Sequence, residues 1–344
     1  MVVKPLLRVD LDAFAANLAR IRTQVEPAQH MLVVKDDAYG HGLEQIVRRA
    51  WREGVRWFGA FDVRTGADVR RVAGPEARIF AWIAATDAEV RAALDLDLDI
   101  GVGEPTLLDD VARLADGGRA RVHLKIDTGL HRNGIRTEDW DAAIRRAAEH
   151  EASGAIVVEG IWSHLAEASD DEDDAAAAAF STAVEAARDA GLTPRIRHLA
   201  ASAASFERPE FRGDLVRVGA FAYGIRPAGG PGEGDLGIRR IASLVAPVVA
   251  VEPAGVRVAT GSLHGLPSTL AGRVTVSTPV GPRRLIRVGA LESVVESWRE
   301  ALRGDEVVVY GEGAASATDL AEQTDTIGEE IAVRVSPLVE RVWL

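Results

Sequence analysis

The fold of this chain is decided by the stretch Val33-Val34-Lys35-Asp36-Asp37-Ala38-Tyr39-Gly40-His41-Gly42. Its apolar, β-branched start continues from Met31 and Leu32 and predicts a buried strand that ends at Lys35, followed by a turn rich in Gly and His. A buried ammonium group without a partner is costly, so such an amine pairs or gives up its proton. A neutral amine is a nucleophile that forms Schiff bases with carbonyl compounds. The alternative, a lysine whose ammonium reaches solvent from the strand end, stays open from Lys35 alone.

The composition indicates a soluble globular protein with more than one domain. The 344 residues (36.7 kDa) suit a barrel of about 250 residues with a small companion domain. Hydrophobic residues make up 47% and charged residues 27%. The formal net charge of −12 argues against a nucleic-acid partner, because phosphate binding needs a clustered basic face. The chain has no cysteine, which excludes disulfides and thiolate zinc sites.

Targeting signals are not evident in the sequence. Residues 1–5 lack the charged-then-apolar pattern of an export signal, and no run of about 18 apolar residues occurs. We therefore expect a cytoplasmic protein that does not span or bind a membrane.

Strand-like and helix-like segments alternate along the first two thirds of the chain. A strand at Leu6–Asp10 precedes a helix that Asp10 or Asp12 caps. Eight apolar strands then follow, at Met31–Lys35, Trp57–Phe61, Arg78–Trp82, Leu98–Val102, Val122–Asp127, Val157–His164, Arg195–Ala201 and Leu215–Tyr223. The helical segments between them are Gly42–Glu53, Thr65–Val72, Ala88–Leu94, Thr106–Leu114, Thr137–His150 and Asp173–Ala190. Eight alternations without a dinucleotide-type glycine loop predict an α/β fold, a (β/α)8 TIM barrel.

Polar residues gather at the ends of these predicted strands. Lys35, Asp127, His164, Ser202 and Tyr223 all lie at or just after a carboxyl end. In a parallel barrel these ends meet at one face, which is where active sites lie. We therefore expect these five side chains to converge on one site.

The acidic run Asp170–Asp174 has two interpretations. It could bind a cation, or it could be the acidic start of a helix, which complements the helix dipole. We favour the helix start and predict no metal site.

A cluster of Gly and Pro at Ala228–Gly234 marks a change in the sequence pattern. We predict a barrel domain over 1–228 and a β-rich domain over 229–344, to which Leu6–Asp10 adds a strand. The expected strands of this second domain are Ile241–Val251, Arg257–Thr260, Gly272–Thr278, Arg284–Val288, Glu306–Tyr310 and Ile331–Val335, with a helical piece near Thr318–Gln323.

The stretch around Lys35 resembles the lysine motif V-V-K-A-D-A-Y-G-H-G of the alanine racemases, with Asp36 where alanine is usual. The resemblance continues in order through Lys125–Gly134, Gly160–Ala166, His198–Ala204 and Val216–Gly219, and so covers the whole barrel. It implies a fold-type III enzyme that uses pyridoxal 5′-phosphate (PLP) and interconverts L- and D-alanine or another small amino acid. It also implies a head-to-tail homodimer whose active sites are shared between the subunits.

The resemblance assigns a role to each matching residue. Lys35 would form the Schiff base with PLP and act as one of the two proton-transfer bases. Arg217 would face the pyridine nitrogen of the cofactor, with His198 behind it and His164 packed on the ring. Because a guanidinium gives up no proton, the cofactor would be a weaker electron sink, which favours reprotonation over transamination. Arg132 would contact the phenolic oxygen and the substrate carboxylate.

Two further groups of residues follow from the same resemblance. Lys125, which is often carbamylated in the family, would orient Arg132. The phosphate would be held by Tyr39, Ser202, Gly219, Ala220 and Trp343, the last of these standing where a tyrosine is usual.

The sequence departs from the family in the second domain. The family motif G-Y-A-D-G-Y-P reads Gly261-Ser262-Leu263-His264-Gly265-Leu266-Pro267 here, so Ser262 replaces the tyrosine that serves as the second base. An unactivated serine hydroxyl is too weak a base for that role, whereas His264 has a suitable intrinsic acidity. The alternatives are therefore a racemase that uses His264 or water, a decarboxylase or lyase on the same cofactor linkage, and a PLP-binding protein without activity.

Overall fold

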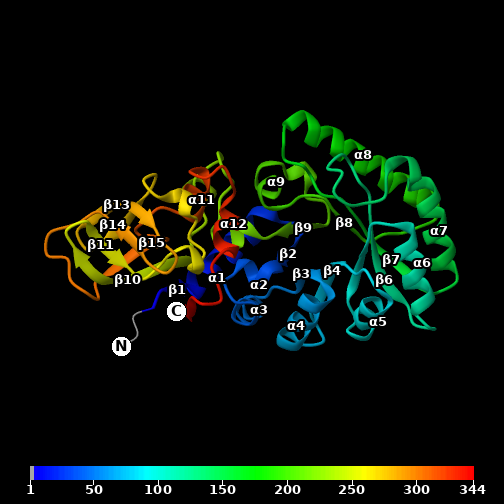
Figure 1. The fold of residues 1–344 in the computed structure, drawn as a ribbon. Coiled ribbons are helices and arrows are strands. Elements are labelled where there is room, and N and C mark those ends of the chain that lie inside the picture. Colours follow the sequence, from blue (N-terminus) through cyan, green and yellow to red (C-terminus); the bar gives the residue numbers. More distant parts are fainter. Residues whose placement is uncertain (1–3) are drawn as a thin grey trace. The chain divides into compact units, whose positions relative to one another are not determined.

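The computed structural model describes residues 4–344 and contains, within that range, two eight-stranded sheets (Figure 1). The chain divides into two compact units. The first contains the described residues up to Arg20, Asp36–Arg49 and Ala220–Leu344, and the second contains Ile21–Lys35 and Ala50–Gly219. The second unit is called the barrel unit below, and the first the β-sheet unit.

The barrel unit is built on a parallel sheet with the strand order β8-β7-β6-β5-β4-β3-β2-β9. Its two outer strands, β8 and β9, are joined by backbone hydrogen bonds from Asp214 N to Arg197 O (2.9 Å) and from Arg217 N to Ala200 O (3.1 Å). The predicted α/β barrel with eight strands is confirmed. The strands are β2 (Gln29–Val33), β3 (Trp57–Asp62), β4 (Arg78–Ile83), β5 (Asp99–Val102), β6 (Ala120–Lys125), β7 (Ile156–Trp162), β8 (Ile196–His198) and β9 (Leu215–Val218).

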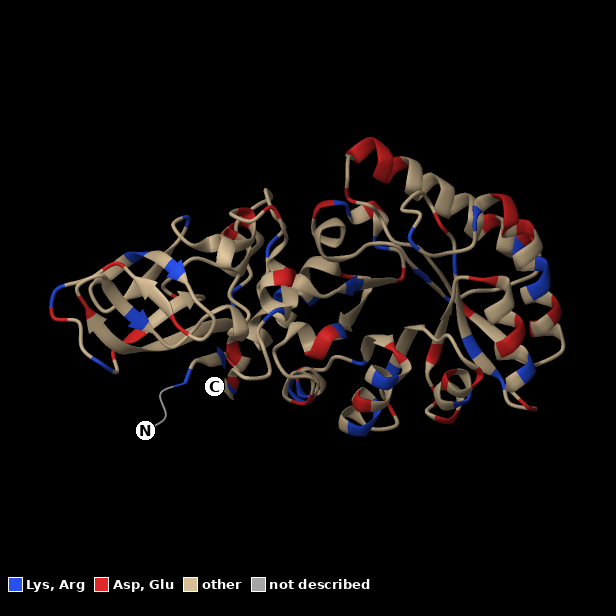
Figure 2. Cartoon of the chain, viewed as in Figure 1, with Lys and Arg blue, Asp and Glu red and all other residues tan. Residues whose placement is uncertain are grey.

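Some of the helices that follow these strands begin at a side-chain cap. The Thr86 side chain and Glu89 form a reciprocal capping box at the start of α5, and the Ser169 hydroxyl accepts from Glu172 N at the start of α8. The acidic run is thus the first turn of α8, as Figure 2 shows by its red end. The helices of this region are α1 (Leu11–Val25), α3 (Leu43–Arg52), α4 (Val63–Ala73), α5 (Asp87–Asp95), α6 (Pro105–Leu114), α7 (Trp140–Ala152), α8 (Asp170–Asp189) and α9 (Ser202–Glu207), with 3-10 turns η1 (Thr137–Asp139) and η2 (Pro209–Phe211).

The interior of the barrel is filled by large side chains that point inward from its strands. A buried cluster consists of Met31, Trp57, Phe80, Trp162, Ile196 and Leu215. Phe80 and Trp162 meet edge to face, with ring centroids 5.1 Å apart. The barrel is therefore a packed core, and chemistry is confined to its ends.

The β-sheet unit contains a mixed sheet with the strand order β11-β14-β13-β12-β15-β10-β1-β16. Strand β1 pairs antiparallel with β10 and parallel with β16, so Leu6–Val9 adds a strand to this sheet. The strands are β1 (Leu6–Val9), β10 (Ala242–Glu252), β11 (Gly255–Val258), β12 (Thr275–Thr278), β13 (Gly281–Val288), β14 (Ser293–Val295), β15 (Glu306–Tyr310) and β16 (Glu340–Trp343). The other elements are α2 (Lys35–Tyr39), α10 (Glu233–Leu236), α11 (Ala317–Glu322), α12 (Gly328–Val333), and the 3-10 turns η3 (Ala220–Tyr223), η4 (Ser262–His264) and η5 (Ser268–Leu270).

One predicted strand of this region is wrong. Residues Ile331–Val335 were expected to form a strand, but α12 runs through Gly328–Val333. Ile331 and Ala332 are buried neighbours, as one face of a short helix allows, and Val333 is exposed. A five-residue segment with four apolar residues is too short for periodicity to distinguish the two structures.

The part of the chain that is described has no helix both long and apolar enough to cross a bilayer.

Candidate functional site

Arg217 lies at the centre of the polar groups at the carboxyl end of the barrel. It is on β9 and is 5% exposed. Its Nη1 donates to His198 O (2.7 Å), and its Nη2 donates to Ser163 O (2.8 Å) and Leu199 O (3.0 Å). Burial lowers the pKa of Arg217 to about 9, so the guanidinium remains charged at neutral pH. Three backbone carbonyls therefore fix a cation at the end of the barrel.

His164 follows β7 and lies against this cation. Its Nδ1 is 3.0 Å from Arg217 Nη2. Burial lowers the pKa of His164 well below its usual value, and so do the positive charges of Arg217, Arg132, Lys125 and Lys35, in that order. His164 is thus a neutral ring that feels the field of four basic side chains, and Lys35 is one of them.

Lys125 ends β6 and is 4% exposed. Its Nζ lies 4.6 Å from the centre of the Trp162 ring. Burial, followed by the charges of Arg132 and Arg217, lowers the pKa of Lys125 to about 8. Lys125 therefore exchanges its proton much closer to neutral pH than an ordinary lysine.

Asp127 holds the loop that carries Arg132. Its Oδ1 accepts from Gly129 N (3.1 Å) and from His131 N (3.0 Å), and its Oδ2 pairs with Arg136 (3.0 Å). Burial acts to raise the pKa of Asp127, but the hydrogen bonds from His131 and Gly129 outweigh it and lower the pKa. The Arg132 side chain is exposed on this loop.

Ser202 and Gly219 form a small polar cradle beside Arg217. Ser202 begins α9, and Gly219 follows β9. The Gly219 amide donates to the Ser202 Oγ at 3.2 Å. A hydroxyl, a backbone amide and nearby cations are groups that bind a phosphate ester.

These residues fit the cofactor that the sequence implies. The basic side chains that act on His164 would attract an anionic ligand. Lys35 would supply the amine for a carbonyl group, and the pair Ser202 and Gly219 would supply the phosphate contacts. The seven predicted residues that the barrel unit contains are Lys35, Arg132, His164, His198, Ser202, Arg217 and Gly219.

The chain after Lys35 turns in a left-handed conformation. Asp36, Asp37, Ala38 and Tyr39 all have φ near 54°. Each such residue other than Gly costs roughly 1–2 kcal/mol. A run of four is a strained segment, and strain of this kind is typical of functional sites.

The other five predicted residues belong to the β-sheet unit. Tyr39 is buried against Tyr223, with ring centroids 4.7 Å apart, and burial raises the pKa of its hydroxyl above the usual range. Ala220 begins η3 and is buried. Trp343 is exposed, and its Nε1 donates to His41 O at 2.9 Å. Tyr223, which was expected at the end of a strand, lies in η3.

Ser262 and His264 lie together in η4. Ser262 is exposed, whereas His264 is 8% exposed. The His264 Nδ1 accepts from Gly261 N at 3.2 Å, and burial lowers the pKa of the ring. A neutral imidazole whose Nδ1 accepts a hydrogen bond carries its own hydrogen on Nε2. In this position the Nε2–H group of His264 can donate a hydrogen bond, but the ring has no free lone pair to accept a proton.

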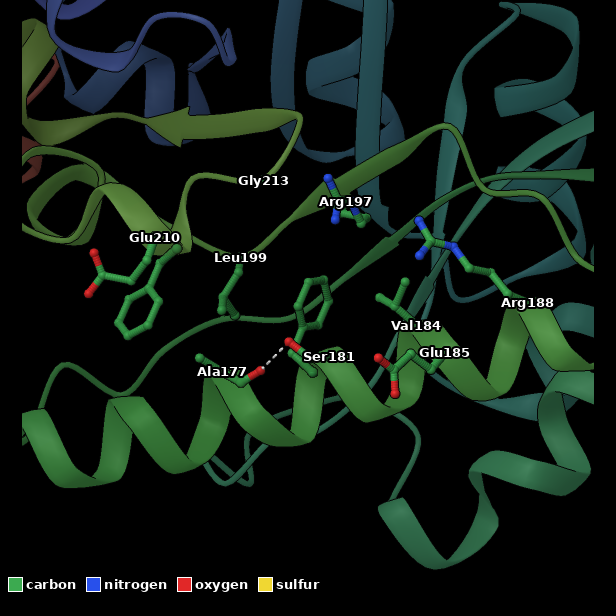
Figure 3. Close-up of a pocket in the computed structure, with 11 residues that line it drawn as sticks. Ala177, Ser181, Val184, Glu185, Arg188, Arg197, Leu199, Glu210 and Gly213 are labelled. Atoms are coloured by element: carbon green, nitrogen blue, oxygen red, sulfur yellow. Dashed lines mark hydrogen bonds between the residues drawn. The ribbon is translucent and has the colours of Figure 1, made fainter.

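A hollow of about 220 Å³ lies between α8 and the segment around η2 (Figure 3). Apolar walls come from Val184 and Leu199, and Figure 3 shows Arg188 and Arg197 beside them. Arg197 is paired with Asp214 at 2.8 Å. The one hydroxyl in its lining, on Ser181, donates to Ala177 O at 3.0 Å and not to a carboxylate, so we place the chemistry at the carboxyl end of the barrel.

Sequence reasoning missed two buried residues behind His198. His123 on β6 and Asp99 on β5 are both 0% exposed and join the same hydrogen-bonded network. The signal available in the sequence was an ionisable residue inside each of two apolar strands.

Comparisons with known proteins agree with this geometry. The family model described as "Alanine racemase, N-terminal domain" matches residues 9–227. A relative named alanine racemase from Beutenbergia cavernae is 37% identical, over 97% of this chain and 96% of its own length. The structure of an alanine racemase from Streptomyces coelicolor A3(2) has a TM-score of 0.96 at 30% identity and covers 100% of this chain and 98% of its own.

A third comparison concerns the fold alone. The alanine racemase from Bartonella henselae, described with covalently bound pyridoxal phosphate, has a TM-score of 0.90 at 20% identity and covers 100% of both chains. The matching family model spans well over half of the chain, and close relatives cover nearly all of it. This chain therefore belongs to the alanine racemase family.

Proposed function

We propose that this chain is a PLP-dependent amino-acid racemase that interconverts the L and D forms of alanine or of another small amino acid. The observation that carries the proposal is the cluster of Lys35, Lys125, Arg132 and Arg217 around His164, in a chain of the alanine racemase family. Racemases of this kind serve the metabolism of D-amino acids.

Different residues of the barrel unit would bind different parts of PLP. Lys35 would hold it covalently, Ser202 and Gly219 would bind its phosphate, and Arg217 would contact its ring from a position fixed by three carbonyls. His164 would pack against the ring, and Arg132 would attract the carboxylate of the substrate. Tyr39, Ala220 and Trp343, which belong to the β-sheet unit, are the remaining residues that the family resemblance assigns to the phosphate. When bound, PLP supplies an electron sink that makes the α-proton of an amino acid acidic.

Proton transfer at the α-carbon would then fall to this chain's own bases. The Lys35 amine, once displaced by the substrate, would remove or return the proton on one side. The other side is the open question, because Ser262 is a weak base and the His264 ring uses its Nδ1 lone pair for Gly261. Racemisation would require that contact to break, or a water molecule to act in its place.

The first test is chemical fixation of the cofactor. The sequence contains three lysines, Lys4, Lys35 and Lys125, so the modified site can be assigned without ambiguity. We expect the purified protein to take up PLP, to absorb at the wavelength of a Schiff base, and to carry the label on Lys35 after borohydride reduction. The Lys35→Ala variant should lose the label and Lys4→Ala should keep it. A wild-type protein that cannot take up PLP would refute the proposal.

The second test separates the possible reactions. Incubation with L-alanine in deuterium oxide should give deuterium at Cα in both enantiomers. Exchange with retention, and no D-alanine, would instead favour a decarboxylase or lyase that needs proton delivery from one side, the reaction that the His264 geometry favours as second candidate. Bound PLP without exchange across a panel of amino acids would indicate a protein that binds the cofactor without catalysis.

We also propose that the enzyme is a cytoplasmic homodimer in which each active site takes residues from both subunits. The support for this is membership of the family and the exposed position of Ser262 in the loop that matches the family's catalytic loop. The small-molecule substrate and a second copy of the chain are the partners we expect, and nucleic acid and membranes are not.

A further inference from the structure

Asp99, His123, His198 and Arg217 form a continuous hydrogen-bonded network through the interior of the barrel. His123 Nε2 lies 3.3 Å from Asp99 Oδ1, and His123 Nδ1 lies 2.9 Å from His198 Nε2. His198 Nδ1 lies 3.3 Å from Arg217 Nη1. Asp99, His123 and His198 are 0% exposed, and Arg217 is 5% exposed. No solvent therefore separates the members of the network.

The two ends of the network have fixed roles. Arg217 can only donate hydrogen bonds. Asp99 accepts bonds from Arg78, whose Nη2 lies 2.5 Å away, and it also lies 3.3 Å from Arg121 Nε. Two guanidinium groups thus keep Asp99 ionised, and an ionised carboxylate only accepts.

Only one placement of hydrogens on the two imidazoles lets Arg217 donate at one end of the network and Asp99 accept at the other. Because Arg217 donates to His198 Nδ1, that nitrogen carries no hydrogen, and His198 must carry its hydrogen on Nε2. His198 Nε2 then donates to His123 Nδ1, so His123 carries its own hydrogen on Nε2 and donates it to Asp99. His123 is therefore a neutral ring, even though an ionised carboxylate lies beside it.

We propose that Asp99 and His123 are positioning residues that hold His198 in the Nε2–H form and thereby keep Arg217 in place at the carboxyl end of the barrel. Each member of the network donates to the next: Arg217 to His198, His198 to His123, and His123 to Asp99, which accepts the last hydrogen bond. If His198 carried a hydrogen on Nδ1, two donors would face each other at 3.3 Å, and the guanidinium would have to move away.

Neighbouring packing leaves the His123 ring little freedom. Phe80 lies against it with centroids 4.9 Å apart, and a Cβ added at Gly160 would come within 2.4 Å of His123 Nδ1. Because Gly160 has no side chain, the His123 ring can approach His198. The packing also holds the His123 ring in one orientation, so that the same nitrogens always face His198 and Asp99.

The direct test is NMR spectroscopy of the full-length wild-type protein with ¹⁵N-labelled histidines. The chain has eight histidines, and single His→Asn variants assign the signals. Couplings between ring nitrogens and carbon-bound hydrogens show which nitrogen carries the hydrogen. We expect neutral Nε2–H forms for both His123 and His198 at neutral pH. A charged His123 ring, or a hydrogen on His198 Nδ1, would overturn the proposal, and the measurement needs no cofactor.

A pair of variants tests the direction of control. His123→Asn keeps an acceptor for His198 Nε2, whereas His123→Leu removes it. We expect the Nε2–H form of His198 to persist in the first variant and to be lost or mixed in the second. His30→Leu, at a half-buried histidine on β2 outside the network, is the control. An unchanged His198 signal in His123→Leu would show that His123 does not set the tautomer.

A further consequence rests on the proposed function. If Arg217 contacts PLP, His123→Leu should weaken PLP binding on the order of tenfold, as the loss of one buried hydrogen bond predicts, and His123→Asn by no more than about threefold. Equal losses in both variants would argue against the positioning role. A wild-type protein that binds no PLP would instead refute the proposed function and leave the NMR result standing.

Discussion

At the scale of single residues, burial and nearby positive charges lower the pKa values of basic side chains at the carboxyl end of the barrel. Lys125 and His164 both have lowered pKa values for these two reasons. Neutral forms of a lysine and a histidine thereby exist beside two arginines. The site thus combines a strong positive field with groups that can still accept a proton.

Lys125 gives a prediction about covalent modification. Its pKa of about 8, against 10.5 for an ordinary lysine, means that the neutral amine becomes common as the pH rises through 8. The neutral amine attacks carbon dioxide, an N–C bond forms, and a proton is released. The resulting carbamate is an anion, which the charges of Arg132 and Arg217 stabilise.

We expect a carbamate signal in the ¹³C NMR spectrum of protein supplied with ¹³C-bicarbonate, growing between pH 7 and pH 9. Lys125→Gln should abolish it, and Lys4→Gln should leave it unchanged. A signal that survives in Lys125→Gln would contradict the assignment.

The residues of the site were predictable to different degrees. Lys35, His164 and Ser202 could be placed in advance, because the carboxyl ends of parallel strands meet at one end of a barrel. Asp99 and His123 could not, because they are 24 positions apart and meet only through the pairing of β5 with β6. A histidine within an apolar strand is ordinarily a satisfied core residue, so the sequence alone gave no reason to connect it with His198.

At the scale of elements, the strained turn after β2 gives a stability prediction. Asp36 is exposed and has φ 54° and ψ 50°. Asp and Asn tolerate this conformation, whereas a β-branched residue is a genuine outlier there. Asp36→Val should therefore lower the free energy of unfolding by about 1–2 kcal/mol. Urea denaturation measures the change, and Asp36→Asn is the matched control, expected within about 0.5 kcal/mol of wild type. Equal stability of Asp36→Val and Asp36→Asn would show that the turn is not strained.

Strand β7 gives a second prediction at this scale. An added Cβ at Gly160 would lie 2.4 Å from His123 Nδ1 and 2.9 Å from Ile196 O, so Gly160→Ala overpacks the barrel interior. We expect a loss of about 1–3 kcal/mol in the free energy of unfolding, together with a shift of the His123 ring signals. Gly234→Ala is the control, because no atom lies within 4 Å of a Cβ at that position. An unchanged stability in Gly160→Ala would mean that the His123 ring has room to move.

The elements of the barrel were more predictable than those of the β-sheet unit. Barrel strands such as β3 and β4 are apolar runs bounded by turns and helices, so their existence could be read from the sequence within one or two residues. In the β-sheet unit, β14 and β16 have three and four residues, too few for a pattern to emerge. α12 was taken for a strand because its apolar run is equally short. For β16, the pairing partner is β1 at the other end of the chain.

At the scale of the whole molecule, two neighbouring loops of the β-sheet unit expose apolar side chains. Leu263 is 55% exposed and Leu291 54%. The loops are joined by hydrogen bonds from Ser262 N to Gly289 O (2.9 Å) and from Leu263 N to Ala290 O (3.0 Å). Exposed leucines on adjoining loops are typical of a surface that another protein covers. Leu263 lies in the loop that matches the family's catalytic loop, and its exposure supports the proposed homodimer.

This arrangement predicts that a charge placed on either leucine weakens the dimer. Wild-type protein should have twice the mass of a 36.7 kDa chain in sedimentation equilibrium, and Leu263→Asp and Leu291→Asp should shift the equilibrium toward the single chain, because a buried carboxylate without a partner is strongly disfavoured. Leu302→Asp, at a leucine that is 66% exposed on another loop, is the matched control and should remain dimeric. If both loop variants stay dimeric at concentrations where wild type begins to dissociate, the shared face lies elsewhere. If the wild-type protein sediments as a single chain, the active site must be complete within one subunit, and proton transfer must rely on groups of this chain alone.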